Sequence, residues 1–402
     1  MTAPLEGVKV VEVASYVAAP AAGALLADLG AEVVKVEVPR GEVYRYSQPR
    51  YAGLRSDFPE SPQFHMDNRG KRSLALDLGR PAAREALGRV IDGADVVLTN
   101  LLPRRAVRYG LDPESLRAGR PELVVAHLSG YGPEGPDAET PSFDYAAYWA
   151  RTGFMDMLRE PDSPPAWQRP GIGDHAAALA LVSGILAALR VRDRTGRGQT
   201  VDVNLMHIGF YVQGNDAAVV LATGQDLPRH DRRRPRNPLW SQYETADGRW
   251  LFLVMIESDR YWPALCDAIG HPELRDDPRF DGAVARYRSS EALTARLAEI
   301  FRERTLAEWE DAFAGRPLIW APVRTLREAL ADPQARAMDM LRTVKHPRLE
   351  PFETVGPPLR LSGHPMPADR PGPDLGADAE AVLREAGLSE EELAAALDRE
   401  PR

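Results

Sequence analysis

One aspartate stands at the head of a long apolar segment, directly after two glycines. Asp174 closes the run RPGIGD at 169–174, and the segment 175–189 repeats leucine and valine at helical spacing. A carboxylate at the start of a helix can cap free N–H groups, or it can serve as a nucleophile. A helix that is apolar on nearly all sides is expected inside a domain, and this one should end near Asp193. The residues alone leave both roles of Asp174 open.

A second glycine-rich stretch tests whether the chain binds a dinucleotide. The sequence 130–135 (GYGPEG) matches G-x-G-x-x-G after an expected strand, but prolines at 133, 136 and 141 disfavour the helix that this fingerprint requires. The first turn of the chain, 14–17, contains no glycine. We therefore expect no NAD site.

Composition narrows the classes of partner. The chain has 402 residues and a net charge of −9, which disfavours nucleic-acid binding but allows a local basic pocket for a small polyanion. The single cysteine, Cys266, excludes a disulfide within the chain and a multi-cysteine metal cluster, and we expect it to be buried and inert; no metal site is predicted. The N-terminus lacks a signal-peptide pattern, and the apolar stretches look too short or too interrupted to span a bilayer. These features predict a cytoplasmic protein without a membrane partner.

The elements that must position Asp174 alternate between strand and helix. A strand at 8–13, a helix at 18–29 and a strand at 32–37 form a β-α-β unit. Further strands are expected at 73–78, 95–98, 123–128 and 200–203, with a helix at 81–91. The alternation predicts an α/β domain with a doubly wound parallel sheet.

The composition changes after residue 203. An apolar helical stretch at 204–223 precedes an arginine-rich loop at 228–238, whose arginines suit either a solvated connection or an anion site. A hairpin is expected around Ala246-Asp247-Gly248. Helices are expected at 259–269, 289–302, 305–314, 379–386 and 389–398, the last with a capping box of Ser389 and Glu392. The block 228–332 therefore looks like a smaller α+β domain.

Six motifs in order resemble the class III coenzyme A transferases, the family of formyl-CoA transferase, carnitine CoA-transferase and α-methylacyl-CoA racemase. They are PLEGVKV at 4–10, LLADLGAEVVKVE at 25–37, NRGKRSLALDL at 68–78, SGYG at 129–132, Gly173-Asp174, and TGRGQ at 195–199. The resemblance extends from Leu5 to about Ser362. It implies a Rossmann-like large domain with a parallel sheet, a smaller α+β domain, and a ring-shaped chain in an interlocked homodimer. The expected divisions are 1–204 for the first part of the large domain, 205–227 for a helical linker, 228–332 for the small domain, and 333–402 for a linker and a C-terminal return.

The resemblance implies that Asp174 is the catalytic nucleophile. Its carboxylate would attack an acyl-CoA, form an anhydride and then an aspartyl-CoA thioester, and pass CoA to a small carboxylic acid. The CoA thioester is thus a substrate, and no permanently bound cofactor is implied. We expect the helix N-terminus to keep Asp174 ionised, and the N–H groups near Gly171 and Gly173 to stabilise oxyanions.

Matching positions predict the coenzyme contacts. They are Val17, Ala18, Arg40, Leu76, Gly79, Asn100, Leu102, Arg108, Phe143 and Asp144. Arg40 would contact the nucleotide phosphates, because Val38 stands where the family often has arginine. Arg108 also fits an exposed charge on a helix.

The racemase branch of this family needs a histidine just before Asp144, and Phe143 stands there instead. Phenylalanine cannot exchange a proton, so the sequence favours a CoA-transferase over a racemase of 2-methylacyl-CoA thioesters. An inactive CoA-binding paralogue is a third reading. Trp149, Phe154 and Trp240 suit either an apolar acyl site or a core, and the loop 234–240 lacks the glycine run of formyl-CoA transferase.

Overall fold

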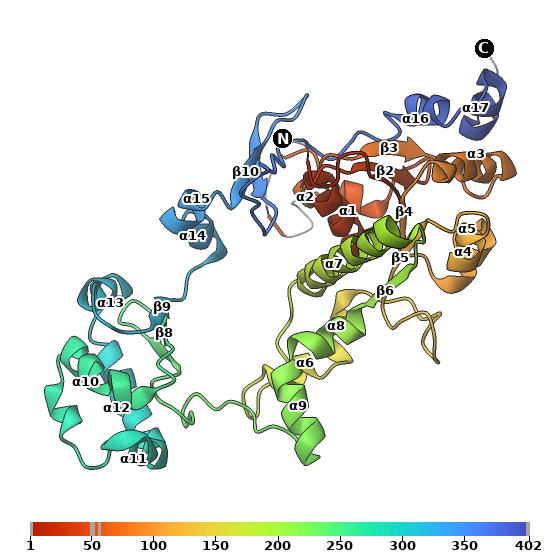
Figure 1. Ribbon diagram of the computed structural model, residues 1–402. Coiled ribbons are helices and arrows are strands. Elements are labelled where there is room, and N and C mark those ends of the chain that lie inside the picture. The colour runs from red at the N-terminus through yellow and green to blue at the C-terminus, as the bar shows by residue number, and fades with distance from the viewer. Residues whose placement is uncertain (1–2, 49–52, 55–57, 399–402) are drawn as a thin grey trace. The chain divides into compact units, whose positions relative to one another are not determined.

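The protein is seen in a computed structural model that describes residues 3–48, 53–54 and 58–398 (Figure 1). The chain divides into two compact units, each of which is described by itself. The large unit comprises 1–155, 167–225 and 334–402, and the small unit comprises 156–166 and 226–333.

A six-stranded parallel sheet forms the centre of the large unit. Its order is β3-β2-β1-β4-β5-β6, so the strand order reverses between β1 and β4. Val10 of β1 is paired with Val33 on one side and Val96 on the other. The strands are β1 (Lys9–Val13), β2 (Glu32–Glu37), β3 (Arg72–Ala75), β4 (Val96–Thr99), β5 (Val124–Ser129) and β6 (Thr200–Asn204). The prediction of a parallel α/β sheet is confirmed, and the boundaries of most strands shift by one to three residues.

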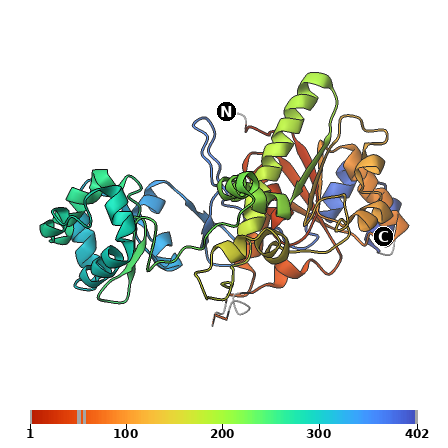
Figure 2. The ribbon, with the colours of Figure 1, turned by 90° about the horizontal axis from the view of Figure 1, so that it is seen from below.

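Helices cover both faces of this sheet, which explains why its strands are continuous apolar runs. Val10 and its neighbour Val11 belong to different core clusters on opposite faces. Helices α1 (Ala18–Asp28) and α7 (Ile172–Thr195) pack on one face, and α3 (Pro81–Asp92), α16 (Ala379–Glu385) and α17 (Glu390–Leu397) pack on the other (Figure 2). Ser389 and Glu392 form the predicted capping box of α17.

Shorter elements surround this framework. They are η1 (Val43–Tyr46), α2 (Pro62–Asn68), α4 (Pro103–Tyr109), α5 (Pro113–Arg117), the π-helix η3 (Tyr145–Ala150), α6 (Phe154–Met157), α8 (Leu205–Val212), α9 (Gly214–Thr223), α15 (Pro333–Ala337) and the antiparallel pair β10 (Leu341–Val344) and β11 (Phe352–Val355). The stretch 130–135 opens no helix, as its prolines predicted.

Two expectations for α7 are wrong. The helix is not buried on all sides, because Leu179 and Leu186 are exposed whereas Leu181 and Ile185 are buried. By length and composition it is also long and apolar enough to cross a membrane, contrary to our expectation for the chain. A core helix meets the same criteria, and the buried side of α7 packs against α1, β5 and β6.

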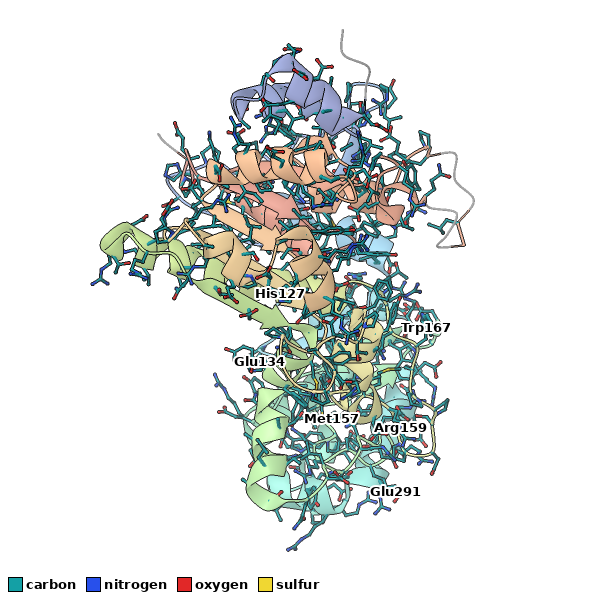
Figure 3. The ribbon with its side chains drawn as sticks, turned by 90° about the vertical axis from the view of Figure 1, so that its right-hand side faces the viewer. His127, Glu134, Met157, Arg159, Trp167 and Glu291 are labelled. Carbon is teal, nitrogen blue, oxygen red and sulfur yellow. The ribbon has the colours of Figure 1, made fainter. Side chains whose placement is uncertain are left out.

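The small unit combines an antiparallel sheet with helices. Its elements are β7 (Gln242–Glu244), β8 (Trp250–Leu253), β9 (Trp320–Pro322), α10 (Ser258–Ile269), η4 (Pro272–Arg275), α11 (Gly282–Arg288), α12 (Ser290–Phe301), α13 (Leu306–Phe313) and α14 (Leu326–Leu330). The predicted hairpin is confirmed as β7 and β8. Cys266 is buried, and burial raises the pKa of its thiol to about 12, as an inert thiol requires. The segment 156–166, with Met157 and Arg159 (Figure 3), belongs to this unit although it lies far away in sequence.

Candidate active site

The turn after β1 meets the turn after β4 at the point where the strand order reverses, which is where open α/β sheets bind ligands. The side-chain amide of Asn100 donates to the Ser15 carbonyl at 2.8 Å, and its oxygen accepts the Ser15 N–H at 3.2 Å. Both ends of this amide are therefore hydrogen-bonded to the backbone of Ser15. Asn100, predicted as a coenzyme contact, shapes the turn between β1 and α1.

A pocket opens beside this turn, at the carboxyl ends of the first four strands of the sheet. Its lining consists of Val13, Ala14, Ser15, Val36, Glu37, Val38, Glu42, Leu76, Asp77, Leu78, Leu101, Arg105 and Tyr109. Leu76 is the predicted contact that lines it. The arginine in the lining is Arg105, which the sequence reasoning missed. It lies one helical turn from the predicted Arg108, and the guanidinium carbons of both lie within 6 Å of the Tyr109 ring centre.

The other predicted contacts are spread around the pocket. Arg40 is exposed after β2, and the N–H of Gly79 is bonded to the Asp77 carboxylate at 2.9 Å. Leu102 is the N-cap residue of α4. Val17 and Ala18 are buried at the start of α1, and a Cβ placed on Gly171 would lie 3.9 Å from Val17 Cγ1. Val17 thus joins the turn after β1 to the turn before Asp174.

Tyr16 holds an unusual backbone conformation in this turn. Its φ of 69° is left-handed, which costs free energy for a residue with a Cβ. The Tyr16 N–H donates to Glu42 Oε2 at 2.5 Å, and the Tyr16 ring meets the Phe143 ring edge-on with centres 4.9 Å apart. The hydrogen bond from Tyr16 to Glu42 therefore holds an aromatic side chain against the exposed Phe143.

A buried network of charges supports Glu42. Lys35 Nζ lies 2.8 Å from Glu42 and 3.0 Å from Glu12, and Lys71 Nζ lies 2.7 Å from the other oxygen of Glu12. Burial outweighs the attraction of Glu12 for Lys71 and lowers the pKa of Lys71 to about 8. Gly23 of α1 is required here, because a Cβ would lie 2.0 Å from Glu12 Oε2. The small residues of α1 thus make room for charges beneath the turn.

Asp174 lies in the first turn of α7 and does not cap it, which corrects the capping interpretation. The N-cap residue is Gly171, with φ 85° and without a side-chain cap. The Gly171 and Gly173 N–H groups instead donate to Asp144 Oδ2, at 3.0 and 3.3 Å. The capping carboxylate therefore belongs to Asp144, the N-cap residue of η3. Because Asp144 already occupies these N–H groups, the expectation that they stabilise oxyanions is also wrong.

Gly173 allows the helix start to approach η3 closely. A Cβ at this position would lie 2.5 Å from the Tyr148 ring. Tyr148 is buried beside Trp149, which stacks on Phe154 with ring centres 4.8 Å apart. Trp149 and Phe154 are thus core aromatics, whereas Trp240 is half exposed on the small unit. The glycine before Asp174 fits a packing requirement.

The surroundings of Asp174 favour its neutral form. Burial, followed by the charges of Asp144 and Asp67, raises its pKa to about 7, while the charge of His175 opposes the rise. The expectation that the helix N-terminus keeps this group ionised is therefore wrong at acidic pH, because burial and the charge of Asp144 raise the pKa of Asp174. A carboxyl with a pKa near neutrality still supplies a large fraction of carboxylate at pH 7, in an environment that hydrates it poorly.

Two histidines and a carboxylate that could hold a metal lie elsewhere in the described part of the large unit, namely Glu60, His65 and His346. The Gly372 N–H donates to His65 Nδ1 and the Arg348 N–H to His346 Nδ1, each at 3.1 Å. Each neutral ring therefore carries its proton on Nε2, and both Nε2 atoms face Glu60 Oε2, at 2.9 and 3.4 Å. A histidine that binds a metal needs one ring nitrogen with a free lone pair, and here both nitrogens of each ring already have partners. The cluster is a hydrogen-bonded joint.

His127 lies on β5 (Figure 3). Its Nε2 lies 3.0 Å from the Leu101 carbonyl oxygen. This contact holds the chain after β4 beside β5, and Leu101 itself lines the pocket.

Comparison with known proteins identifies relatives over nearly the whole chain. The model of CoA-transferase family III matches residues 5–379. The (R)-2-hydroxy-4-methylpentanoate CoA-transferase of Clostridioides difficile is 31% identical over 389 residues, covering 97% of each chain. The cinnamoyl-CoA:phenyllactate CoA-transferase of Clostridium sporogenes is 32% identical over 391 residues, covering 96% of this chain and 94% of the relative.

A solved structure shares the fold. The crystal structure of a CaiB/BaiF family protein from Brucella suis is 32% identical in sequence and superimposes with a TM-score of 0.84. The match covers 96% of this chain and 100% of that one. The sheet described above is therefore the sheet of a known family.

Proposed function

The chain belongs to CoA-transferase family III and is an enzyme that transfers coenzyme A, and we propose that Asp174 is the nucleophile of this transfer. The observation that carries the proposal is the position of Asp174. It is a poorly hydrated carboxylate in the first turn of α7, next to a turn that touches the ligand-binding edge of the parallel sheet.

The proposed reaction is a double displacement. The Asp174 carboxylate bonds to the acyl carbon of the donor thioester as the carbon–sulfur bond breaks, which gives a mixed anhydride and a CoA thiolate. The thiolate then attacks the aspartyl carbonyl and releases the donor acid, leaving an aspartyl-CoA thioester. The acceptor carboxylate attacks that thioester, and the thiolate returns to the acceptor's acyl carbon. The product is a new acyl-CoA, and Asp174 is restored.

Each part of the proposed site has a physical task. Partial burial of Asp174 limits the access of water, which would otherwise hydrolyse the anhydride. Asp144 fixes the turn of Gly171 and Gly173 and so orients the start of α7. The pocket with Arg105 would receive the nucleotide part of CoA, because a guanidinium suits phosphate groups. The substrates are an acyl-CoA and a small carboxylic acid, and the proposal needs no permanently bound cofactor.

Phe143 supports transfer over racemisation. Its ring is half exposed and packs against Tyr16 beside Asp144, where a racemase of this kind would need a proton-exchanging group. Incubation in deuterium oxide with a 2-methylacyl-CoA and no acceptor acid should therefore leave the α-carbon unlabelled. Incorporation of deuterium would instead establish the racemase.

The proposal also includes a cytoplasmic homodimer. The dimer is supported by exposed apolar side chains on α8 and α9, where Tyr211 is 79% and Leu221 86% exposed. Exposed apolar surface of this kind is typical of protein–protein interfaces.

The function is tested by turnover. Purified protein is incubated with short, branched or aromatic acyl-CoA donors and with matched acceptor acids, and the CoA esters are separated by chromatography. We expect a new acyl-CoA to form with at least one donor–acceptor pair, and Asp174→Asn to abolish it. Equal turnover by Asp174→Asn would contradict the proposal.

A further inference from the structure

A second carboxylate reaches the start of α7 from another element. Asp67, at 2% exposed, lies near the end of α2, and its Oδ1 lies 3.0 Å from His175 Nε2. His175 directly follows Asp174. Asp67 and His175 are separated by more than 100 positions in the sequence, so the fold of the large unit brings them together.

The surroundings of the His175 ring favour its charged form. A hydrogen bond to Asp67, the charges of Asp67 and Asp174, and a hydrogen bond to the Gly171 backbone together outweigh burial and raise the pKa of His175. An imidazole that donates from both ring nitrogens is an imidazolium. A ring held in this way is poorly placed to take a proton from a substrate, but it can act as a fixed positive charge.

The other charges that act on Asp174 have the opposite sign. Asp144 at the start of η3 and Asp67 on α2 both disfavour its carboxylate. Tyr44 of η1 interacts with Asp67, and Tyr145 of η3 interacts with Asp144; both phenols have raised pKa values and stay neutral. His175 is the cation among the groups that act on Asp174 here, within the part of the chain that the structure describes.

We propose that Asp67 and His175 form a carboxylate–imidazolium pair that keeps Asp174 ionised enough to act as a nucleophile. This inference rests on the proposed function and adds a positioning residue to it. Asp67 holds the ring in its charged form, and His175 offsets the negative charge that Asp144 and Asp67 place around the nucleophile. The role is electrostatic, and no proton passes from His175 to the substrate.

The first test measures the His175 ring without any substrate. Protein labelled with ¹⁵N at histidine is titrated by NMR, and the His175 signals are identified by their loss in His175→Gln. We expect both ring nitrogens of His175 to stay protonated above the ordinary histidine pKa, and Asp67→Asn to return the ring to neutral near pH 7. A neutral His175 ring at pH 7 in the wild-type protein would overturn the proposal.

The second test measures the rate of adduct formation on Asp174 as a function of pH. We expect this rate to rise with pH as Asp174 ionises (the acidic limb of the profile) and to level off at alkaline pH. His175→Gln should move the acidic limb to higher pH by about one unit, which lowers the rate at a given pH on that limb about tenfold. The rate on the alkaline plateau should change little. The control is His271→Gln, which removes an exposed histidine–carboxylate pair with Glu273 on the small unit and should leave the limb in place.

The outcomes separate the two proposals. An adduct on Asp174 with an unchanged acidic limb in His175→Gln would overturn the role of His175 and leave the transferase mechanism intact. If the wild-type protein forms no adduct, the mechanism fails, and the NMR titration still decides the charge of His175. Thermal unfolding of each variant at alkaline pH shows whether it is folded.

Discussion

Three charged groups act on Asp174, and two of them come from distant segments of the chain. Asp144 comes from η3, Asp67 from α2, and His175 from the next position on α7. The sequence indicated Asp174 as the candidate nucleophile through its glycines, its helix and the family resemblance. It could not predict that Asp144 would cap the helix, because a contact across 27 positions depends on how η3 packs against α7.

Asp144 and His175 should change the ionisation of Asp174 in opposite directions. Asp144→Asn keeps an oxygen that can accept the Gly171 and Gly173 N–H groups but removes a negative charge near the nucleophile. The acidic limb of adduct formation should therefore move downward by about half to one pH unit. Quenched-flow mass spectrometry across a pH series measures this shift. An acidic limb that stays in place or moves upward would contradict an effect of the Asp144 charge on Asp174.

Ionisation of Asp174 should also affect stability. Folding raises its pKa from 3.8 to about 7, so the fold favours the protonated form, and stability is lost as the pH rises from about 4 until it has passed about 7. Asp174→Asn removes this penalty and should stabilise the protein by about 1–3 kcal/mol above pH 7, with no gain below about pH 4. Urea unfolding at several pH values measures the difference. An equal gain at every pH would exclude an ionisation effect.

At the scale of elements, strands were predicted well because buried parallel strands are short apolar runs bounded by turns. The coenzyme contacts were less predictable. Arg105 and Arg108 lie one turn apart on α4, and the sequence does not show which of them lines the pocket. Asn100 has the right place at the strand end, but only the structure shows that Ser15 occupies its amide.

The packing of α7 on β6 depends on a glycine. A Cβ on Gly184 would lie 2.5 Å from Val201 Cγ1, whereas a Cβ on Gly88 of α3 meets no atom within 4 Å. Gly184→Ala should therefore lower the free energy of unfolding by about 1–3 kcal/mol. The matched change Gly88→Ala should raise it by about 0.5–1 kcal/mol, because alanine favours a helix. Urea unfolding of the two variants compares them. Stabilisation by both would contradict the close approach of α7 to β6.

At the scale of the whole molecule, the packing of segments that are distant in the sequence could not be predicted. The segment 156–166 joins the small unit although both its flanks belong to the large unit. The exposed apolar side chains of α7, α8 and α9 were likewise not predicted. A helical pattern of apolar residues predicts burial, but it does not show whether the same chain or a second copy covers them.

The proposed homodimer makes a prediction about these helices. Leu221→Asp combined with Tyr211→Asp places charges on exposed apolar side chains of α8 and α9. We expect the double variant to shift toward monomer in light scattering coupled to gel filtration, because a charge is costly in an apolar interface. Val284→Asp, at an exposed position on α11, serves as the control. If the wild-type protein is a monomer, or if the double variant remains a dimer, α8 and α9 do not form the dimer interface.

The identity of the nucleophile is tested most directly by peptide mass mapping after a short incubation with an acyl-CoA, quenched with hydroxylamine. Hydroxylamine cleaves an aspartyl anhydride or thioester and leaves a hydroxamate on the residue that carried it. Our account predicts the hydroxamate on Asp174, and none in Asp174→Asn. A hydroxamate on another residue, or turnover without any covalent modification of the protein, would contradict it.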